Sequence, residues 1–173
     1  MTARDRIFNL MNTPIETDDG YITIKQLVPG HHTIRGQRIV GITKTIAPDE
    51  HLICFEKDAL GKNVPSQRTL MSKEHKIYYK NKLQEAQNFL EDFDLVSKRK
   101  YSGEPLYNVL LEYHGVMIVN NMPCETLHPN SLSAKLYTSI RYSSSVREQI
   151  LATIHRAIQK KDYKTYRKIM KRI

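Results

Sequence analysis

Apolar and polar residues alternate in short runs along the first three quarters of the chain, and turn-forming residues separate the runs. From Thr13 to Leu27 the alternation surrounds Asp19-Gly20, a dipeptide that suits the positive φ angles of a tight hairpin turn. We expect strands in this stretch and in the runs 37–46, 51–60, 68–72, 75–80, 105–113 and 115–121. Many short strands joined by tight turns predict a compact, mainly β body.

Three stretches of this series allow a closer prediction. The runs 68–72 and 75–80 are separated only by Lys73-Glu74, so we expect them to pair as a hairpin. The segment 83–90, LQEAQNFL, predicts a short helix. The stretch 120–129, NNMPCETLHP, ends the last apolar run, and we expect it to form the final strand of the body.

The pattern changes after residue 129. The next segment is rich in serine, which predicts a linker or an arm laid over the β body. From Val146 to Ile158 an apolar residue recurs every four positions, which is the spacing of one face of a helix. Ser143 or a neighbouring serine can cap this helix, and Asp162 can cap a second one. We therefore divide the chain into a β body (1–129), a linker or arm (130–145) and a helical tail (146–173).

Positive charge is concentrated at the C-terminal end. The chain has 27 Lys and Arg against 18 Asp and Glu, a net charge of +9. Residues 143–173 hold nine of these basic residues and two acidic ones, so they carry +7. The nine are Arg147, Arg156, Lys160, Lys161, Lys164, Arg167, Lys168, Lys171 and Arg172. Such a run is most often a solvated helix face, and an acidic protein surface or nucleic acid is the alternative partner.

Composition argues against several classes of protein. No apolar run is long enough to cross a bilayer, and the N-terminal residues 1–10 carry charges on both sides of Ile7-Phe8, unlike a secretory signal. The two cysteines, Cys54 and Cys124, provide neither a disulfide framework nor a zinc site. We expect an intracellular protein in a reducing compartment, with no metal, no cofactor and no small-molecule substrate.

Four motifs occur in order along the chain. Residues 13–30 carry a threonine-bearing strand followed by an Asp-Gly dipeptide, and Ser72-Lys73-Glu74-His75 places a hydroxyl residue three positions before a histidine. Residues 106–114 and 117–121 are two further strand patterns. Together these motifs resemble the Hint superfamily, the self-processing domains of hedgehog proteins and inteins: its Asp-Gly signature, its Thr-x-x-His motif and its last two strands. The resemblance spans about residues 8–128 and implies a horseshoe-like pseudo-barrel of short strands. Segments with a similar CETLHP ending occur in proteins of large DNA viruses.

The resemblance also implies a chemistry that this chain cannot complete. In the family, a Cys or Ser attacks the preceding carbonyl, the motif histidine protonates the leaving nitrogen, and a terminal His-Asn pair cleaves the other end. Family spacing places Phe8 at the nucleophile position and Glu125-Thr126 at the terminal pair. Neither phenylalanine nor threonine has the atoms that these steps need. We therefore expect no catalytic residues, and vestigial ones at Ser72, His75, Cys124, Glu125 and Thr126.

The cysteines and histidines also have structural explanations. Cys54 and Cys124 lie in apolar alternation, which favours small buried side chains. His75 is expected to be held by hydrogen bonds at a strand start, and His128 to meet solvent. Removal of Met1 would expose Thr2 as an N-terminal nucleophile, but its position does not fit the family.

Three functional hypotheses follow. The first is a catalytically inactive Hint-fold structural or interaction protein, such as a minor capsid or virion component that contacts other proteins of an assembly. The second is a residual self-cleaving domain that uses Ser72 or Cys124 with His75. The third is a non-specific nucleic-acid-binding protein that acts through the basic tail.

Overall fold

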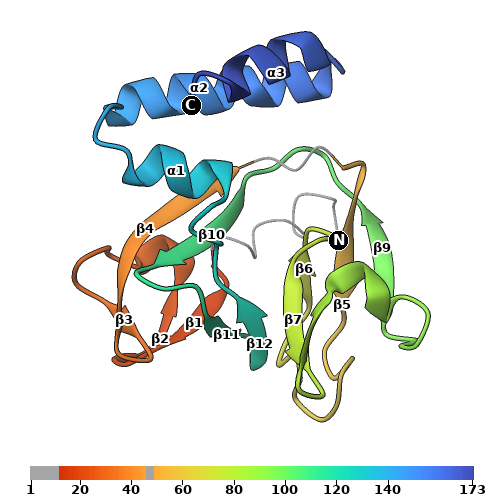
Figure 1. Cartoon of the computed structure of the whole chain (residues 1–173). Helices are drawn as coiled ribbons and strands as arrows, with labels where there is room; N and C mark the ends of the chain where they lie inside the picture. The colour runs from red at the N-terminus through yellow and green to blue at the C-terminus, as the bar shows by residue number, and fades with distance from the viewer. Residues whose placement is uncertain (1–11, 46–48) are drawn as a thin grey trace.

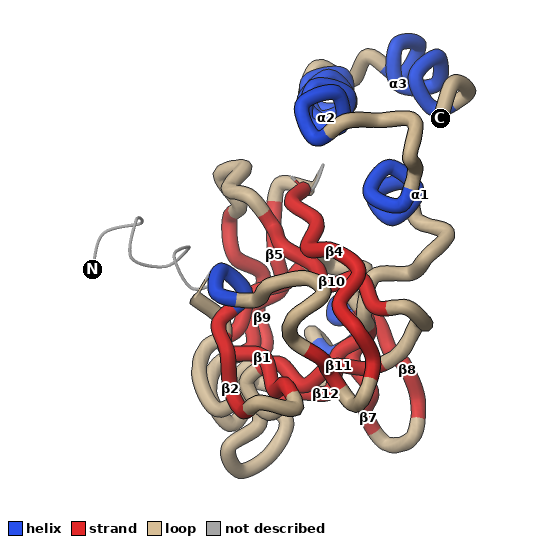
Figure 2. Tube along the Cα trace, turned by 90° about the vertical axis from the view of Figure 1, so that its left-hand side faces the viewer, coloured by secondary structure: helices blue, strands red, loops and turns tan. Residues whose placement is uncertain are grey.

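The computed structural model describes residues 12–45 and 49–173 of the chain. Two layers are visible in Figure 1: a β body below, and three helices stacked above it. The view turned by 90° in Figure 2 shows the same order, with α1 next to the strands and α2 and α3 farther out. The mainly β body with C-terminal helices is the fold class predicted from the sequence.

The β body contains one large and two small antiparallel sheets among the described residues. The six-stranded sheet has the order β2-β1-β11-β12-β7-β8. Its strands are β1 (Pro14–Thr17), β2 (Gly20–Thr23), β7 (Lys76–Tyr79), β8 (Lys82–Glu85), β11 (Val116–Val119) and β12 (Met122–Glu125). Short 3-10 helices, η2 (Ile24–Gln26) and η3 (Ala86–Phe89), follow β2 and β8.

The two small sheets lie on opposite sides of the body in Figure 1. One has the order β10-β4-β3 and the other β6-β5-β9. Their strands are β3 (Thr33–Ile34), β4 (Gln37–Thr45), β5 (His51–Phe55), β6 (Thr69–Met71), β9 (Val96–Lys100) and β10 (Leu106–Leu111). The large sheet contributes strands to both sides, which gives the open, horseshoe-like arrangement.

Two hairpins follow directly from their turn residues. β1 and β2 pair as a hairpin, as predicted, but the turn residues are Asp18-Asp19, one position before the expected Asp19-Gly20; Gly20 has φ 101° and already pairs with Thr17. β11 and β12 pair across Asn120 and Asn121, whose φ angles are 47° and 65°. Asparagine tolerates this left-handed region better than most residues, so the pair forms a two-residue hairpin turn. The last predicted strand is thus confirmed as β12.

The predicted hairpin between 68–72 and 75–80 is wrong, although both strands exist. β6 pairs with β5, where Met71 lies opposite Ile53, whereas β7 pairs with β8 and β12. β7 turns back on β8 through Lys80-Asn81, whose φ angles of 47° and 63° make the tighter hairpin. The chain therefore changes sheets between β6 and β7.

The helix predicted at 83–90 is also wrong. Its first residues belong to β8, and the rest forms the single 3-10 turn η3. Ala86 and Phe89 are three residues apart, so both face inward from this turn, and both are buried. The strand expected at 51–60 ends at Phe55.

The core of the body is built from aliphatic and aromatic side chains of all three sheets. The largest fully buried ones are Phe55, Phe89, Ile15, Ile34, Ile39, Ile53, Ile77, Leu110 and Met122. The Phe89 ring packs edge-on against Phe55 and Tyr79, with centroid distances of 5.7 and 5.6 Å. Cys54 and Cys124 are fully buried free thiols, as predicted.

The segment expected to be a linker or arm contains the helix α1 (Leu132–Thr138), which packs on β4. A β-carbon added at Gly41 of β4 would lie 3.5 Å from Cδ1 of Tyr137, an ordinary van der Waals distance, so α1 packs directly over this position of the strand. Ala134 and Leu136 are fully buried.

The tail forms α2 (Ser144–Gln159) and α3 (Tyr163–Met170), with Ser143 and Asp162 as N-caps, as predicted. α2 buries Leu151, Ile154 and Ala157, whereas Val146 is exposed, so the buried face is rotated from the one expected. Among its described residues, α3 buries none completely. The tail therefore packs on its own chain through α2, and α3 is the outermost element.

Candidate functional site

A cavity of about 340 Å³ lies within the β body. It is lined by Thr13, Ile24, Asp49, Thr69, Leu70, Met71, Ser72, Lys73, Glu74, His75, Leu106, Tyr107, Asn108, Met117, Val119 and Cys124. These residues come from the segment before β1, from η2, from the residues before β5, from β6 and the loop after it, and from β10, β11 and β12. Three of the five predicted vestigial residues, Ser72, His75 and Cys124, therefore line one cavity.

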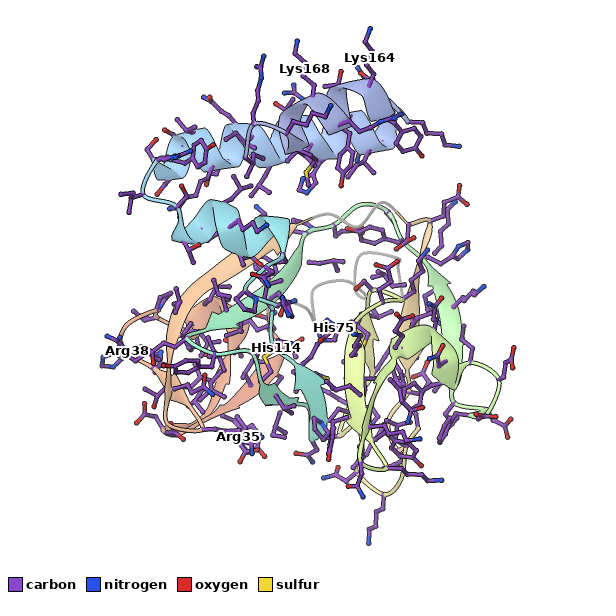
Figure 3. All side chains as sticks on the ribbon, viewed as in Figure 1. Arg35, Arg38, His75, His114, Lys164 and Lys168 are labelled. Atoms are coloured by element: carbon purple, nitrogen blue, oxygen red, sulfur yellow. The ribbon has the colours of Figure 1, made fainter. Side chains whose placement is uncertain are left out.

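His75 is fixed by its backbone at the point where the chain changes sheets. Its N–H donates to the Ser72 carbonyl at 3.1 Å, and its own carbonyl accepts from Ala86 N at 2.8 Å. Burial lowers the pKa of His75, because a charged imidazole loses hydration there, and the nearby Glu125 carboxylate opposes this only in part. Figure 3 shows the ring in the middle of the body.

No other described residue makes a hydrogen bond with the His75 imidazole. The hydrogen bonds expected to hold this residue are thus made by its backbone alone. His75 therefore places a neutral imidazole on the wall of the cavity, which is partly apolar. Such a group could exchange protons with a bound molecule, but it needs a nucleophile beside it to cleave a peptide bond.

Cys124 does not supply that nucleophile. It lies on β12 between Ile77 of β7 and Met117 of β11 and has no exposed surface. Burial, with a smaller contribution from the Glu125 charge, raises the pKa of its thiol to about 12. Since the thiolate is the reactive form, this cysteine is inert at neutral pH.

Ser72 is half-buried on the cavity wall, and no hydrogen bond joins its hydroxyl to His75 in the part of the chain that the structure describes. The neighbouring Thr69 belongs to a network that the sequence did not indicate. Its hydroxyl accepts from Asn120 Nδ2 at 2.9 Å, and Asn120 Oδ1 accepts from Gln67 Nε2 at 3.0 Å. These contacts anchor the β11–β12 turn to β6.

Glu125 and Thr126 lie outside the cavity lining and hold strands together. Glu125 Oε1 accepts from Lys76 N at 3.2 Å, and its Oε2 lies 3.3 Å from His114 Nε2. Thr126 Oγ1 accepts from Gly115 N at 3.0 Å and donates to Gly115 O at 3.2 Å. Both side chains therefore attach the end of β12 to the β7 start and the β10–β11 loop.

Three further residues singled out in the sequence are His128, Phe8 and Thr2. His128 is exposed, as expected, and its ring centroid lies 4.8 Å from that of His114. Phe8 and Thr2, the two proposed nucleophile positions, lie outside the described residues.

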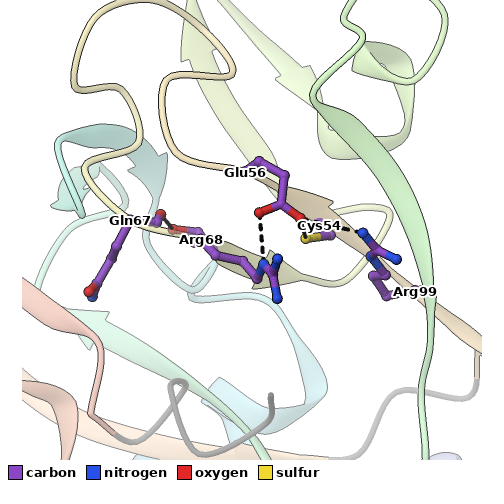
Figure 4. Close-up of polar contacts among 6 residues, drawn as sticks. Cys54, Glu56, Gln67, Arg68 and Arg99 are labelled. Atoms are coloured by element: carbon purple, nitrogen blue, oxygen red, sulfur yellow. Dashed lines mark hydrogen bonds and ion pairs between the residues drawn. The ribbon is translucent and has the colours of Figure 1, made fainter. Parts of the chain in front are cut away.

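The other cysteine, Cys54, belongs to a salt-bridge network around Glu56 (Figure 4). Glu56 accepts from Arg68 Nε at 2.8 Å, from Arg99 Nη2 at 3.4 Å and from the Cys54 thiol at 3.6 Å. Burial raises the pKa of Cys54, and the charge of Glu56 raises it further. This thiol is therefore also unreactive, and the network joins β5, β9 and the residues before β6.

The described residues offer no group of three or more His, Cys, Asp or Glu side chains that could hold a metal ion. Within the same part of the chain, none of the helices has the length and apolar character to cross a membrane.

The basic residues of the tail differ in their surroundings. Arg147 is half-buried, with its guanidinium 4.8 Å from the Tyr137 ring centroid and its Nη1 donating to Tyr137 O at 3.0 Å. It thus connects α2 to α1. The other eight are exposed: Arg156, Lys160, Lys161, Lys164, Arg167, Lys168, Lys171 and Arg172.

The family model of the Hint domain matches residues 9–131. Two crystal structures of the MchDnaB-1 intein are similar to the chain over 68% of its length and 98% of theirs, at 12% identity. Their TM-scores are 0.49 and 0.45, and the likeness concerns the fold alone. No curated protein matches the chain.

Proposed function

The chain belongs to the Hint domain family, and we propose that it is a member without self-cleaving activity that serves as a structural or interaction module of a larger assembly. The intein-like fold supports a shared scaffold. What the chain does with that scaffold depends on which reactive groups it keeps.

One observation carries the proposal: the residues that could replace the missing reactive groups are inert or otherwise engaged. The Cys124 thiol has a pKa of about 12, so it is protonated at neutral pH. The Thr126 hydroxyl already accepts a hydrogen bond from Gly115 N and donates one to Gly115 O. Ser72 has no base hydrogen-bonded to it among the described residues, and an unactivated serine is a weak nucleophile.

His75 alone does not rescue catalysis. A positioned general acid contributes only about 10²- to 10⁴-fold to a rate. Without a nucleophile to accept the acyl group, the cleavage step that this acid would accelerate does not begin.

The proposal is tested with the full chain carrying a folded extension before Met1 and another after Ile173. We expect the intact mass to be unchanged after days at neutral pH, in the wild type and in His75→Ala alike. Shortening of the wild type that is absent in His75→Ala would establish residual self-processing and end the proposal.

We further propose that the partners are other proteins of an assembly in an intracellular, reducing compartment. The two buried free thiols are compatible with such a compartment. A virion that contains this chain as a minor capsid component is one such assembly. The matched proteins do not indicate a viral origin. Co-purification with assembled particles that resists about 1 M salt, where the Debye length is about 3 Å, would support docking. A chain recovered only in free form would contradict it.

A further inference from the structure

Exposed positive charge gathers at the C-terminal end of the helical layer. We call the basic face the exposed side chains of Lys160, Lys161, Lys164, Arg167, Lys168, Lys171 and Arg172. This stretch of the chain contains one acidic residue, Asp162. Seven cations against one carboxylate make it the most strongly charged stretch of the tail.

The chain does not neutralise this charge internally. Among the described residues, no cation of the basic face makes an ion pair, whereas Arg38, Arg68, Lys73 and Arg99 of the β body each have a carboxylate partner. Asp162 is already used, since its Oδ1 accepts from Thr165 N at 3.1 Å as the cap of α3. That bond also lowers the pKa of Asp162.

The cations on α3 face away from the rest of the protein. The half-buried residues of α3 are Thr165, Tyr166, Ile169 and Met170, so the remaining positions face outward. Figure 3 shows Lys164 and Lys168 pointing away from the β body. They are one turn apart, which is a rise of about 6 Å along the helix axis.

The composition of the face distinguishes between anionic partners. Protein interfaces are built around apolar and aromatic anchors and are depleted in lysine. Five of the seven cations are lysines, and the only large hydrophobic side chain of α3 that stands clearly exposed is Tyr163, at 55%. A tyrosine among lysines suits a nucleic acid strand, because the ring can stack on a base while the cations meet phosphates.

We propose that the basic face binds the sugar-phosphate backbone of nucleic acid without reading its sequence. This goes beyond the proposed function, because it adds a second kind of partner on a surface outside the cavity. It does not depend on the loss of self-cleavage, so either proposal can fail without the other.

The test measures binding of the full chain to a fluorescent 20-nucleotide single strand of mixed sequence between 50 and 200 mM salt. If five of the cations contact phosphates, the affinity falls roughly 100-fold over this range, at about 0.7 in log-log slope per contact. Replacing two of them in Lys164→Gln/Lys168→Gln should reduce that fall to roughly 20-fold. Tyr163→Ala should weaken binding by about fivefold or more through lost stacking.

The matched control is Lys57→Gln/Lys62→Gln, which removes the same charge from exposed lysines between β5 and β6. That loop lies at the end of the body opposite the helices in Figure 1. The proposal expects the control to retain the wild-type slope and a strand of unrelated sequence to bind equally well. A flat salt response, equal loss in both double variants, or binding of an acidic protein but not of the strand would overturn it.

Discussion

The β body pairs several of its cations with carboxylates, whereas the basic face of the helical layer pairs none with a described residue. In the body, Arg68 and Arg99 share the Glu56 carboxylate, and Lys73 lies 2.8 Å from Asp49. In the layer, the basic face has no carboxylate partner among the described residues. Charges that are paired within the chain can stabilise its fold, whereas clustered charges of one sign repel each other and lower its stability. A cluster of such charges is therefore better explained by a binding partner than by folding.

The two regions also differ in how firmly they are packed. The core of the body joins all three sheets and has several side chains with no exposed surface, among them Phe55, Ile15 and Ile77. The layer becomes less buried outward: α1 buries Leu136 completely, α2 buries three side chains, and α3 buries none of its described residues. The Hint match ends at residue 131, just before α1 begins. The family match therefore covers the described strands of the body and none of the helices α1 to α3.

The largest effect is expected from the core. Phe89→Ala removes a ring that packs on Phe55 and Tyr79, and it should lower the free energy of unfolding by about 3–5 kcal/mol. Tyr166→Ala on α3, where the ring is half-buried, should lower it by about 1 kcal/mol or less. Urea unfolding followed by circular dichroism checks both. Equal losses would mean that the layer is packed as firmly as the body.

The strands of the body could be predicted from the sequence because alternation is a local property. Their partners could not, since pairing depends on residues distant in the chain. Only Lys73-Glu74 separates the two runs of the failed hairpin, yet burial of Met71 beside Ile53 places one in a different sheet from the other. Likewise, the apolar positions of 83–90 fit a helix, and the pairing of β8 with β7 overrides that preference.

The candidate site was predictable only through the family resemblance. Residue spacing alone does not bring Ser72, His75 and Cys124 to one cavity, because Cys124 is 49 positions beyond His75. The bond between Asn120 and Thr69 spans 51 positions and has no local signal either. Glu125 was expected as a vestigial residue, but its contacts with Lys76 N and His114 depend on how the end of β12, the start of β7 and the β10–β11 loop come together.

An intermediate effect is expected from two histidines, one in each region. Burial lowers the pKa of His75 in the body and of His155 in α2. The unfolded chain therefore binds more protons than the folded one below about pH 6.5, and stability falls as the pH drops through that value. One such group contributes at most about 1.4 kcal/mol per pH unit.

Urea unfolding at several pH values between 7 and 5 separates the two contributions. His75→Gln should reduce the pH slope of the body transition, and His155→Gln should reduce that of the helical signal. An unchanged slope in His75→Gln would mean that its imidazole is hydrated and that the cavity is open to water. That outcome would also weaken the description of His75 as a neutral group.

The smallest effect is expected from the cations of the basic face, and it compares them directly with a paired cation of the β body. Lys164→Gln/Lys168→Gln should change the free energy of unfolding by no more than about 0.5 kcal/mol. Neither side chain makes an ion pair with a described residue, and the charge of Lys164 is the smallest of the influences that lower the pKa of Asp162. Lys73→Gln should cost up to about 1 kcal/mol, because it breaks the partly exposed pair with Asp49. Chemical unfolding at low salt, where charge effects are largest, compares them. If the double variant lost more stability than Lys73→Gln, the basic face would be supporting the fold itself, and its charge would not point to an external polyanion.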